Sequence, residues 1–121
     1  MYSAWLIASA NDANDNPISK VGVYDGTNGT DIHVSVGFYP SFVIIKSINQ
    51  NSTNWVQVDS YRGAYENKSD NVGMLYMNSD ATATTGSTQV FFDGDGFNIE
   101  GSTAGGQLST INQKYLYWAV K

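Results

Sequence analysis

Short runs of alternating apolar and polar residues, separated by clusters of Gly, Asn and Asp, dominate this sequence and leave almost no helical periodicity. Alternation with a period of two places successive side chains on opposite faces of a β-strand. Ile32, Val34 and Val36 alternate in this way with His33 and Ser35. Many such runs at short spacing are typical of a β-sandwich or a β-barrel, and we therefore expect an all-β protein.

One run is apolar at every position. It comprises Phe42, Val43, Ile44 and Ile45, and three of these four residues are β-branched. Strands that are covered on both faces show this pattern, so we expect this strand in the middle of a sheet. The remaining strands are expected near residues 4–8, 18–24, 32–36, 55–59, 74–77, 88–92, 97–99 and 115–120.

The chain of 121 residues contains no internal repeat and no long linker, which predicts one domain over residues 1–121. An up-and-down barrel would need an even number of strands and a filled or hollow lumen. We expect instead a two-layer antiparallel β-sandwich of jelly-roll or concanavalin-like type.

The composition argues against several classes of partner. Charged residues make up only 14% of the chain and the net charge is −5, with Lys and Arg scattered along the sequence. A nucleic-acid surface needs clustered basic residues, so nucleic acid is not expected as a partner. No apolar run approaches the length of a membrane span, no signal peptide is recognisable, and the chain has no Cys for thiolate metal sites or disulfides.

The segment Asp93-Gly94-Asp95-Gly96 resembles the start of a calcium loop. An EF-hand loop needs further oxygen ligands, a Gly at its sixth position and a distal Glu, whereas this segment leads directly into the apolar Phe97. Asp-Gly pairs commonly join strands. We therefore interpret the segment as a structural turn, and expect no metal or cofactor.

His33 is the only histidine and is expected on the polar face of a strand, with Asp31 two residues away on the same face. A general base needs a nucleophile or an orienting carboxylate within hydrogen-bond reach, and a strand-surface pair is rarely catalytic. The carboxylates lie mostly in turns, without the spaced pair of a glycosidase and without a nucleophile elbow. We therefore expect no catalytic residues and no enzymatic activity.

Asp59-Ser60-Tyr61-Arg62-Gly63 places the only Arg beside the end of an expected strand. Its guanidinium could hold a carboxylate or backbone carbonyls and so fix the connection that follows, or it could hold a ligand or a neighbouring subunit. Tyr and Trp side chains also anchor protein interfaces and stack on sugars. Trp118 alternates with Leu116 and Val120 and is expected in the core. The predicted interface residues are Tyr61, Arg62, Tyr65, Tyr115 and Tyr117.

Several short segments, taken in order, resemble a β-sandwich domain family found in tailed-bacteriophage virion and tail proteins. They are a Gly/Asn turn, a Gly-Phe-x-Pro element, an apolar strand that ends in Lys, and a series of shorter motifs. The resemblance covers most of residues 24–121 and implies a concanavalin-like sandwich, with residues 1–23 as an added N-terminal strand or arm. The segments are Tyr24–Thr30, Val36–Lys46, Trp55-Val56, Asp59-Ser60, Arg62-Gly63, Asn78-Ser79, Asp95–Phe97 and Tyr117–Ala119.

The resemblance implies a structural protein on the outer surface of a phage capsid or tail. A small stand-alone sandwich suits a capsid decoration (cement) protein or a small tail-appendage component better than a fibre, which needs a shaft. Its expected partners are major capsid or tail proteins and further copies of itself. Two other hypotheses stay open: a carbohydrate-binding module that attaches to a host glycan, and a hydrolase with dispersed carboxylates.

Overall fold

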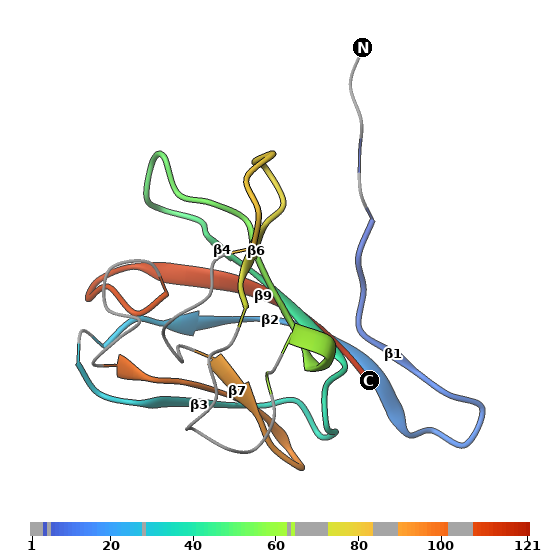
Figure 1. The fold of residues 1–121 in the computed structure, drawn as a ribbon. Coiled ribbons are helices and arrows are strands. Elements are labelled where there is room, and N and C mark those ends of the chain that lie inside the picture. Colours follow the sequence, from blue (N-terminus) through green and yellow to red (C-terminus); the bar gives the residue numbers. More distant parts are fainter. Residues whose placement is uncertain are drawn as a thin grey trace.

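The computed structural model describes residues 4, 6–27, 29–62, 64, 73–83, 90–101 and 108–121. In these ranges nine strands form two antiparallel sheets, with six strands in the order β1-β2-β9-β4-β5-β6 and three in the order β3-β8-β7 (Figure 1). The predicted all-β, two-layer antiparallel sandwich is confirmed. The elements are β1 Ala10–Asn11, β2 Pro17–Asp25, β3 Ile32–Ser35, β4 Phe42–Ser47, β5 Val56–Asp59, the 3-10 turn η1 Ser60–Arg62, β6 Leu75–Tyr76, β7 Val90–Phe92, β8 Gly96–Ile99 and β9 Lys114–Val120.

β4 lies in the middle of the six-stranded sheet, between β9 and β5, as its uninterrupted apolar sequence predicts. Val43 and Ile45 are fully buried in the space between the two sheets. Ile44 points to the opposite side of the sheet and is still only 8% exposed. The outer side of the sheet therefore also carries apolar cover over this strand.

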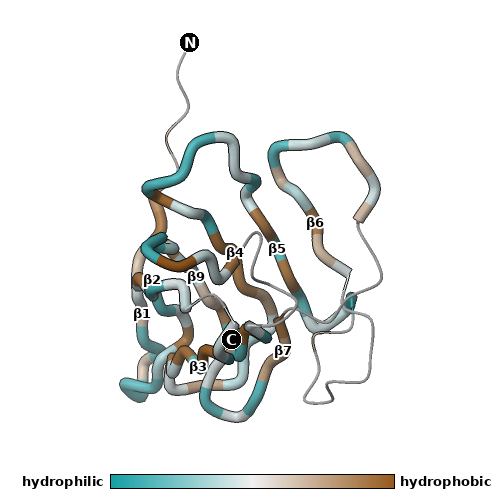
Figure 2. The backbone as a smooth tube through the Cα atoms, turned by 90° about the vertical axis from the view of Figure 1, so that its left-hand side faces the viewer, coloured by the Kyte–Doolittle hydropathy of each residue, from teal (hydrophilic) through white to brown (hydrophobic). Residues whose placement is uncertain are grey.

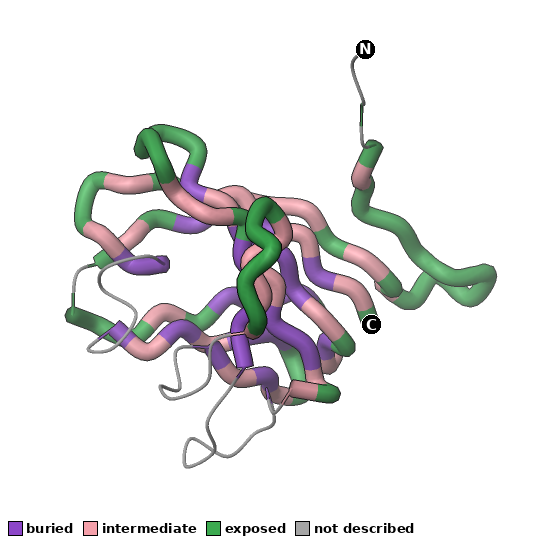
Figure 3. The backbone as a smooth tube through the Cα atoms, turned by 45° about the horizontal axis from the view of Figure 1, so that its top comes forward, coloured by how far each residue is buried: buried purple, intermediate pink, exposed green. Residues whose placement is uncertain are grey.

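The core lies between the sheets, where buried residues concentrate (Figure 3). Phe97 of β8 is fully buried and meets the larger sheet through edge-on aromatic contacts. Its ring centroid lies 5.3 Å from that of Tyr117 and 6.3 Å from that of Tyr24. Aromatic rings favour such edge-to-face packing, so these contacts join the two layers. The hydropathy of the backbone follows the same division, with apolar stretches along β4 and β5 and hydrophilic connecting loops (Figure 2).

The faces of β9 are the reverse of those predicted. Tyr115 is fully buried and Tyr117 is 5% exposed, so these residues lie in the core and the prediction that they form an interface is wrong. Trp118, predicted in the core, lies half-buried on the outer face of the sheet. Alternation divides a strand into two faces but does not say which of two apolar faces is covered by the second sheet.

Local contacts explain why the tyrosines can be buried. Tyr115 stacks on Tyr24 with ring centroids 5.0 Å apart, and its hydroxyl accepts a hydrogen bond from the Thr110 N–H at 3.0 Å. The Tyr24 hydroxyl donates to the Leu108 carbonyl at 2.9 Å. A buried hydroxyl is costly only when it lacks a partner, so these bonds permit burial. Burial and the neighbouring Tyr115 raise the pKa of Tyr24 well above its usual range.

Tyr117 occupies space that a glycine leaves open. Gly22 of β2 is its register partner, and a Cβ atom at Gly22 would lie only 2.4 Å from the Tyr117 hydroxyl oxygen. That distance is far below any van der Waals contact, so the tyrosine packs inward only because residue 22 has no side chain. Burial also raises the pKa of Tyr117.

The connection after β2 does not form a hairpin, although it begins with an Asp-Gly pair of the kind that commonly joins paired strands. β2 belongs to the six-stranded sheet and β3 to the three-stranded sheet, so the chain crosses between layers here. Gly26 makes the crossing possible, because a Cβ atom at this position would lie 2.0 Å from the Thr110 carbonyl oxygen. Its N–H donates to the Gln113 carbonyl at 3.0 Å, which holds the crossing against the start of β9.

The N-terminal part of the chain also differs from the prediction. Ala4 and residues 6–9 form no strand, and Leu6 is 99% exposed where the chain projects from the body (Figure 1). β2, in contrast, pairs with β9 over residues 19–25. β2 includes residues 17–23 and lies inside the larger sheet, between β1 and β9. No helix in the described ranges is long and apolar enough to cross a membrane.

The burial pattern predicts different losses of stability when two nearby isoleucines, Ile45 and Ile48, are replaced by alanine. Ile45→Ala removes a fully buried side chain and should reduce the free energy of unfolding by about 2–5 kcal/mol. Ile48→Ala, the matched control at a position 53% exposed, should change it by less than about 0.5 kcal/mol. Urea unfolding of both variants measures the difference, and equal losses would contradict the described core.

Candidate functional site

The outer face of the six-stranded sheet, turned away from the three-stranded sheet, carries a second set of apolar side chains. β9 sends Leu116 and Trp118 to this face, and β4 sends Phe42 and Ile44. Ile44 and Trp118 are register partners on adjacent strands. The smaller sheet covers the inner face, and among the described residues no layer of secondary structure covers these side chains.

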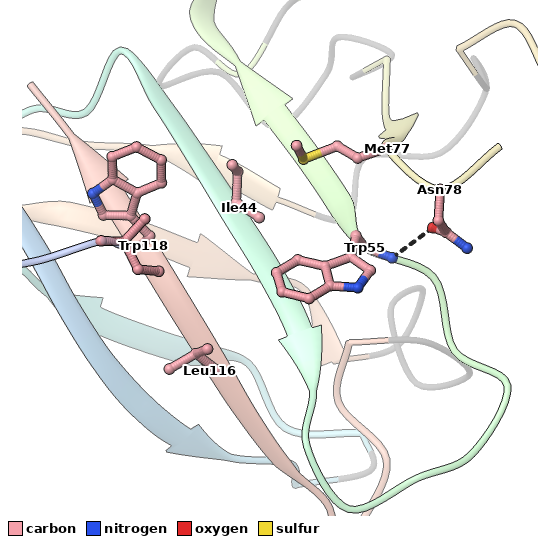
Figure 4. A pocket seen from close by; sticks show the side chains of 7 residues that line it. Ile44, Trp55, Met77, Asn78, Leu116 and Trp118 are labelled. Atoms are coloured by element: carbon pink, nitrogen blue, oxygen red, sulfur yellow. Dashed lines mark hydrogen bonds between the residues drawn. The ribbon is translucent and has the colours of Figure 1, made fainter. Parts of the chain in front are cut away.

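An open groove of about 540 Å³ lies on this face (Figure 4). Ile44 lies between Trp118 on one side and Trp55 on the other, and Leu116 and Met77 complete the apolar walls. We call this feature the outer groove. It is lined by Ile7, Ile44, Trp55, Met77, Asn78, Leu116 and Trp118.

The two indole rings are held by different contacts. Trp118 packs edge-on against Phe42, with ring centroids 5.4 Å apart and planes at 86°. Trp55 precedes β5 and is 41% exposed. Its backbone N–H donates to Asn78 Oδ1 at 2.9 Å, and its carbonyl accepts from the Met77 N–H at 2.9 Å. The backbone of Trp55 is therefore fixed, while its ring remains accessible.

Polar contacts stabilise the loop beside the groove. Asn78 Nδ2 donates to Asn54 Oδ1 at 3.1 Å, which links the loop before β5 to the turn after β6. Lys46 extends from β4 and its Nζ donates to the Thr53 carbonyl and, at 2.6 Å, to Thr53 Oγ1. The Lys46 ammonium group is therefore hydrogen-bonded within the loop. The groove has an apolar centre and a polar border.

The lining of the outer groove contains no titratable side chain, and its polar side-chain groups are the Asn78 amide and the indole N–H groups of Trp55 and Trp118. Acid–base or nucleophilic chemistry needs titratable or nucleophilic groups within reach of a substrate, and the described lining residues supply none. Trp, Met and aliphatic side chains inside a polar border are the composition of the centre of a protein–protein interface.

The predicted interface residues do not come together in one place. Tyr61 is 94% exposed on η1, next to Arg62, whereas Tyr115 and Tyr117 are in the core. Tyr65 lies outside the described residues. Sequence reasoning missed the outer groove because it assigned Trp118 to the wrong face. The sequence feature that could have indicated the groove was the apolar character of both faces of β4 and β9.

Arg62 fixes the start of the connection after β5, as one of its two interpretations predicted. Its Nη1 contacts Asp59 Oδ2, and its backbone N–H donates to Asp59 Oδ1 at 2.9 Å. The Arg62 carbonyl accepts from the Gly73 N–H at 2.9 Å, which holds the two ends of this connection together. Asp59 is 8% exposed, so its charge is buried with a partner.

The Asp93–Gly96 segment is a turn that joins β7 to β8, as interpreted from the sequence. Asp93 Oδ1 accepts from the N–H groups of Asp95 and Gly96 at 2.9 and 2.8 Å. Asp93 Oδ2 accepts from Asn98 Nδ2 at 2.7 Å and lies 3.2 Å from His33 Nε2. Both oxygens of this carboxylate therefore accept hydrogen bonds that stabilise the turn. Across the described ranges, no group of three or more His, Asp or Glu side chains could hold a metal ion.

The fold and the groove define a small β-sandwich with an apolar groove on the outer face of its larger sheet. The family model described as "Domain of unknown function (DUF7483)" matches residues 11–121, and the chain belongs to this family. The match begins before β2, in agreement with the position of that strand inside the sheet. No curated protein and no solved structure matches the chain.

The Asp93 turn predicts a pH-dependent contribution to stability. Burial alone would raise the pKa of Asp93, but the hydrogen bonds from Asn98, Asp95 and Gly96, with the nearby His33, outweigh it and lower that pKa below 3.8. A lowered folded-state pKa gives stability that is present above the unfolded pKa and lost as the pH falls through the folded value. Stability should therefore decrease below about pH 4.

Denaturant unfolding between about pH 5 and about pH 2 tests this expectation. Asp93→Asn should be less stable than the natural chain near neutral pH and should lose less stability on acidification. Some acid sensitivity should remain in the variant, because hydrogen bonds from Asn16 and Asn14 also lower the pKa of Asp12. Identical pH profiles for the two proteins would contradict the role of Asp93.

Proposed function

We propose that this protein is a structural component on the outer surface of a tailed-phage virion that works by protein–protein contact and without catalysis. It is a capsid decoration protein or a small tail-appendage component. The outer groove is the contact surface, and the partner is a major capsid or tail protein. The observation that carries this proposal is the pair of Trp side chains beside Ile44 on a sheet face that no second layer of the described strands covers.

The character of the groove supports protein contact. Residues that dominate binding energy at interfaces are enriched in Trp, Tyr and Arg, and lie in well-packed pockets surrounded by groups that exclude water. Trp55 is accessible and backbone-fixed, so it meets a partner with little loss of conformational freedom. A groove of this size gives modest affinity per copy, and repetition over a particle surface multiplies it.

The virion setting is supported by the resemblance of the sequence motifs to domains of tailed-phage virion and tail proteins. The low content of charged residues and the Asn-, Ser-, Thr- and Gly-rich surface agree with an extracellular particle. This part of the proposal is separable from the groove, because the same surface could bind a protein partner in another setting.

Mass spectrometry of purified particles tests the virion setting. In particles of a phage that encodes this chain, the protein should be present in stoichiometric amounts and should remain after stringent washing. Its absence from intact particles would overturn the assignment to the virion.

Truncation of the exposed indole tests the groove. Trp55→Ala should weaken binding to the particle by about 2 kcal/mol or more, because it removes the accessible aromatic anchor. Ile111→Ala is the control, since Ile111 is an apolar residue of similar exposure, 54%, outside the groove lining. A binding assay with particles that lack the protein measures both variants, and equal affinity of Trp55→Ala and the natural chain would exclude the groove as the contact surface.

A carbohydrate-binding module is the second candidate function. The exposed ring of Trp55 on an open groove favours it, because aromatic faces stack on sugars. A sugar site also needs polar groups that bind hydroxyls. Here the Asn78 Oδ1 and Nδ2 are already bonded, which leaves the indole N–H donors of Trp55 and Trp118 in the lining.

A glycan array distinguishes the two functions. If the groove binds a host glycan, the array should give a defined ligand whose binding is lost in Trp55→Ala and retained in Trp55→Phe, which keeps an aromatic face. No bound glycan, together with intact binding to particles, would reject the carbohydrate-binding function.

A further inference from the structure

The segment that precedes β1 is attached to β2 on the side of the sheet where Trp118 lies. The Ser19 hydroxyl donates to the Ala8 carbonyl at 2.7 Å, and the Val21 N–H donates to Ser9 Oγ at 3.0 Å. Val21 is in turn the register partner of Trp118 on β9. These two bonds therefore bring the segment next to the part of the outer groove that Trp118 forms (Figure 4).

Ile7 is the residue of this segment that reaches the groove. It is half-buried and lines the groove together with Ile44 and Trp118, whereas the other described residues of the segment do not line it. Leu6, the preceding residue, is 99% exposed. Successive side chains of an extended chain point to opposite sides. The segment therefore occupies the groove with one of two adjacent aliphatic side chains and directs the other into solvent.

The attachment of this segment is weak. Ala4 and residues 6–9 belong to no strand. Each of the two hydrogen bonds to β2 uses a serine hydroxyl in place of a paired backbone group. Chain segments with few bonds and mostly exposed side chains open at a small cost in free energy. The segment can therefore leave the groove without disturbing either sheet.

The indole N–H of Trp118 lacks a hydrogen bond in this arrangement. Its Nε1 atom is buried, and no described residue accepts a hydrogen bond from it. The buried hydroxyls of Tyr24 and Tyr115, in contrast, both have partners. A buried donor without an acceptor is unfavourable. The aliphatic side chain of Ile7 offers no acceptor, whereas a peptide carbonyl placed beside Trp118 would supply one.

We propose that residues 6–9 form a displaceable strap, which covers the Trp118 side of the outer groove in the free protein. A partner binds by replacing the strap with an extended peptide segment of its own, which places an aliphatic side chain where Ile7 lies and a carbonyl beside Trp118 Nε1. Because the strap belongs to the same chain, it competes at a high effective concentration. This inference rests on the outer groove as the contact surface of the proposed function, but not on the virion setting.

A synthetic peptide with the sequence of residues 4–10 serves as the probe for displacement. NMR of the ¹⁵N-labelled full chain measures its dissociation constant through the indole N–H signal of Trp118, which should move downfield as it gains an acceptor. Ile7→Ser, which removes the strap from the groove, should bind the peptide about tenfold more tightly than the natural chain, as for a groove that the strap leaves open about one tenth of the time.

Leu6→Ser is the matched control, because Leu6 is the adjacent aliphatic residue and does not line the groove. It should leave the dissociation constant of the natural chain unchanged. Circular dichroism checks that both variants are folded. Peptide binding by Ile7→Ser that is no tighter than by the natural chain would overturn the strap, because Ile7 would then be a fixed part of the surface. Absence of peptide binding to both proteins would overturn it as well.

The natural chain gives a second readout that needs no variant. Nuclear Overhauser contacts between the Ile7 methyl groups and the Trp118 ring should be present in the free protein and should weaken as peptide is added. Contacts that persist at saturating peptide would overturn displacement. The particle-binding assay of Trp55→Ala tests the proposed function separately, since the peptide experiment involves no particle and either result can fail alone.

Discussion

The position of β9 between β2 and β4 is the constraint on which the rest of the structure depends. β9 is the last strand of the chain, yet it pairs over most of its length with both neighbours in the larger sheet. Its register decides that Tyr115 and Tyr117 point inward and that Leu116 and Trp118 point outward. A slip by one residue would exchange the two faces of the strand. Gly22, which leaves room for Tyr117, and the hydroxyl partners of Tyr24 and Tyr115 oppose such a slip.

The unequal size of the two sheets explains why a binding surface exists at all. Three strands cover the inner face of a six-stranded sheet, and in the part of the chain that the structure describes no further layer of strands or helices covers its outer face. An apolar outer face would ordinarily be replaced by polar residues in an antiparallel sheet that faces water. Here Ile44, Leu116 and Trp118 occupy it, and Trp55 projects beside them. Exposed apolar patches are common at sites of contact with other molecules, which is why the outer groove is the contact surface in the proposed function.

Charged side chains affect the outer groove mainly because they lie outside it, in turns and loops. Asp59 with Arg62, and Asp93 with His33 and Asn98, stabilise connections between strands. Lys46 is bonded within the loop that precedes Trp55. Because these side chains are engaged in turns and loops, the centre of the groove is left without charge, which favours an apolar partner over a charged substrate.

Much of the fold was determined by local sequence. Alternation at Ile32–Ser35, the uninterrupted apolar run of β4 and the Asp-Gly turn before β8 each specify their own structure, because they depend on backbone geometry and on neighbouring residues. The sequence thereby determined an antiparallel sandwich with β4 inside a sheet. It did not determine which side of β9 faces the smaller sheet, because both sides are apolar and the choice depends on contacts with distant strands, among them the space that Gly22 leaves for Tyr117.

The candidate site required the tertiary structure for the same reason. Trp55, Ile44 and Trp118 come from three different segments and meet only when β4 pairs with both of its neighbours. The sequence pattern of residues 4–8 predicts a strand, but the described residues among them do not pair with a strand edge. Here a local pattern was present and a partner strand was not. Side-chain alternation is a local property, whereas the covering of a face or an edge depends on contacts between distant strands, and only the assembled sheet decides it.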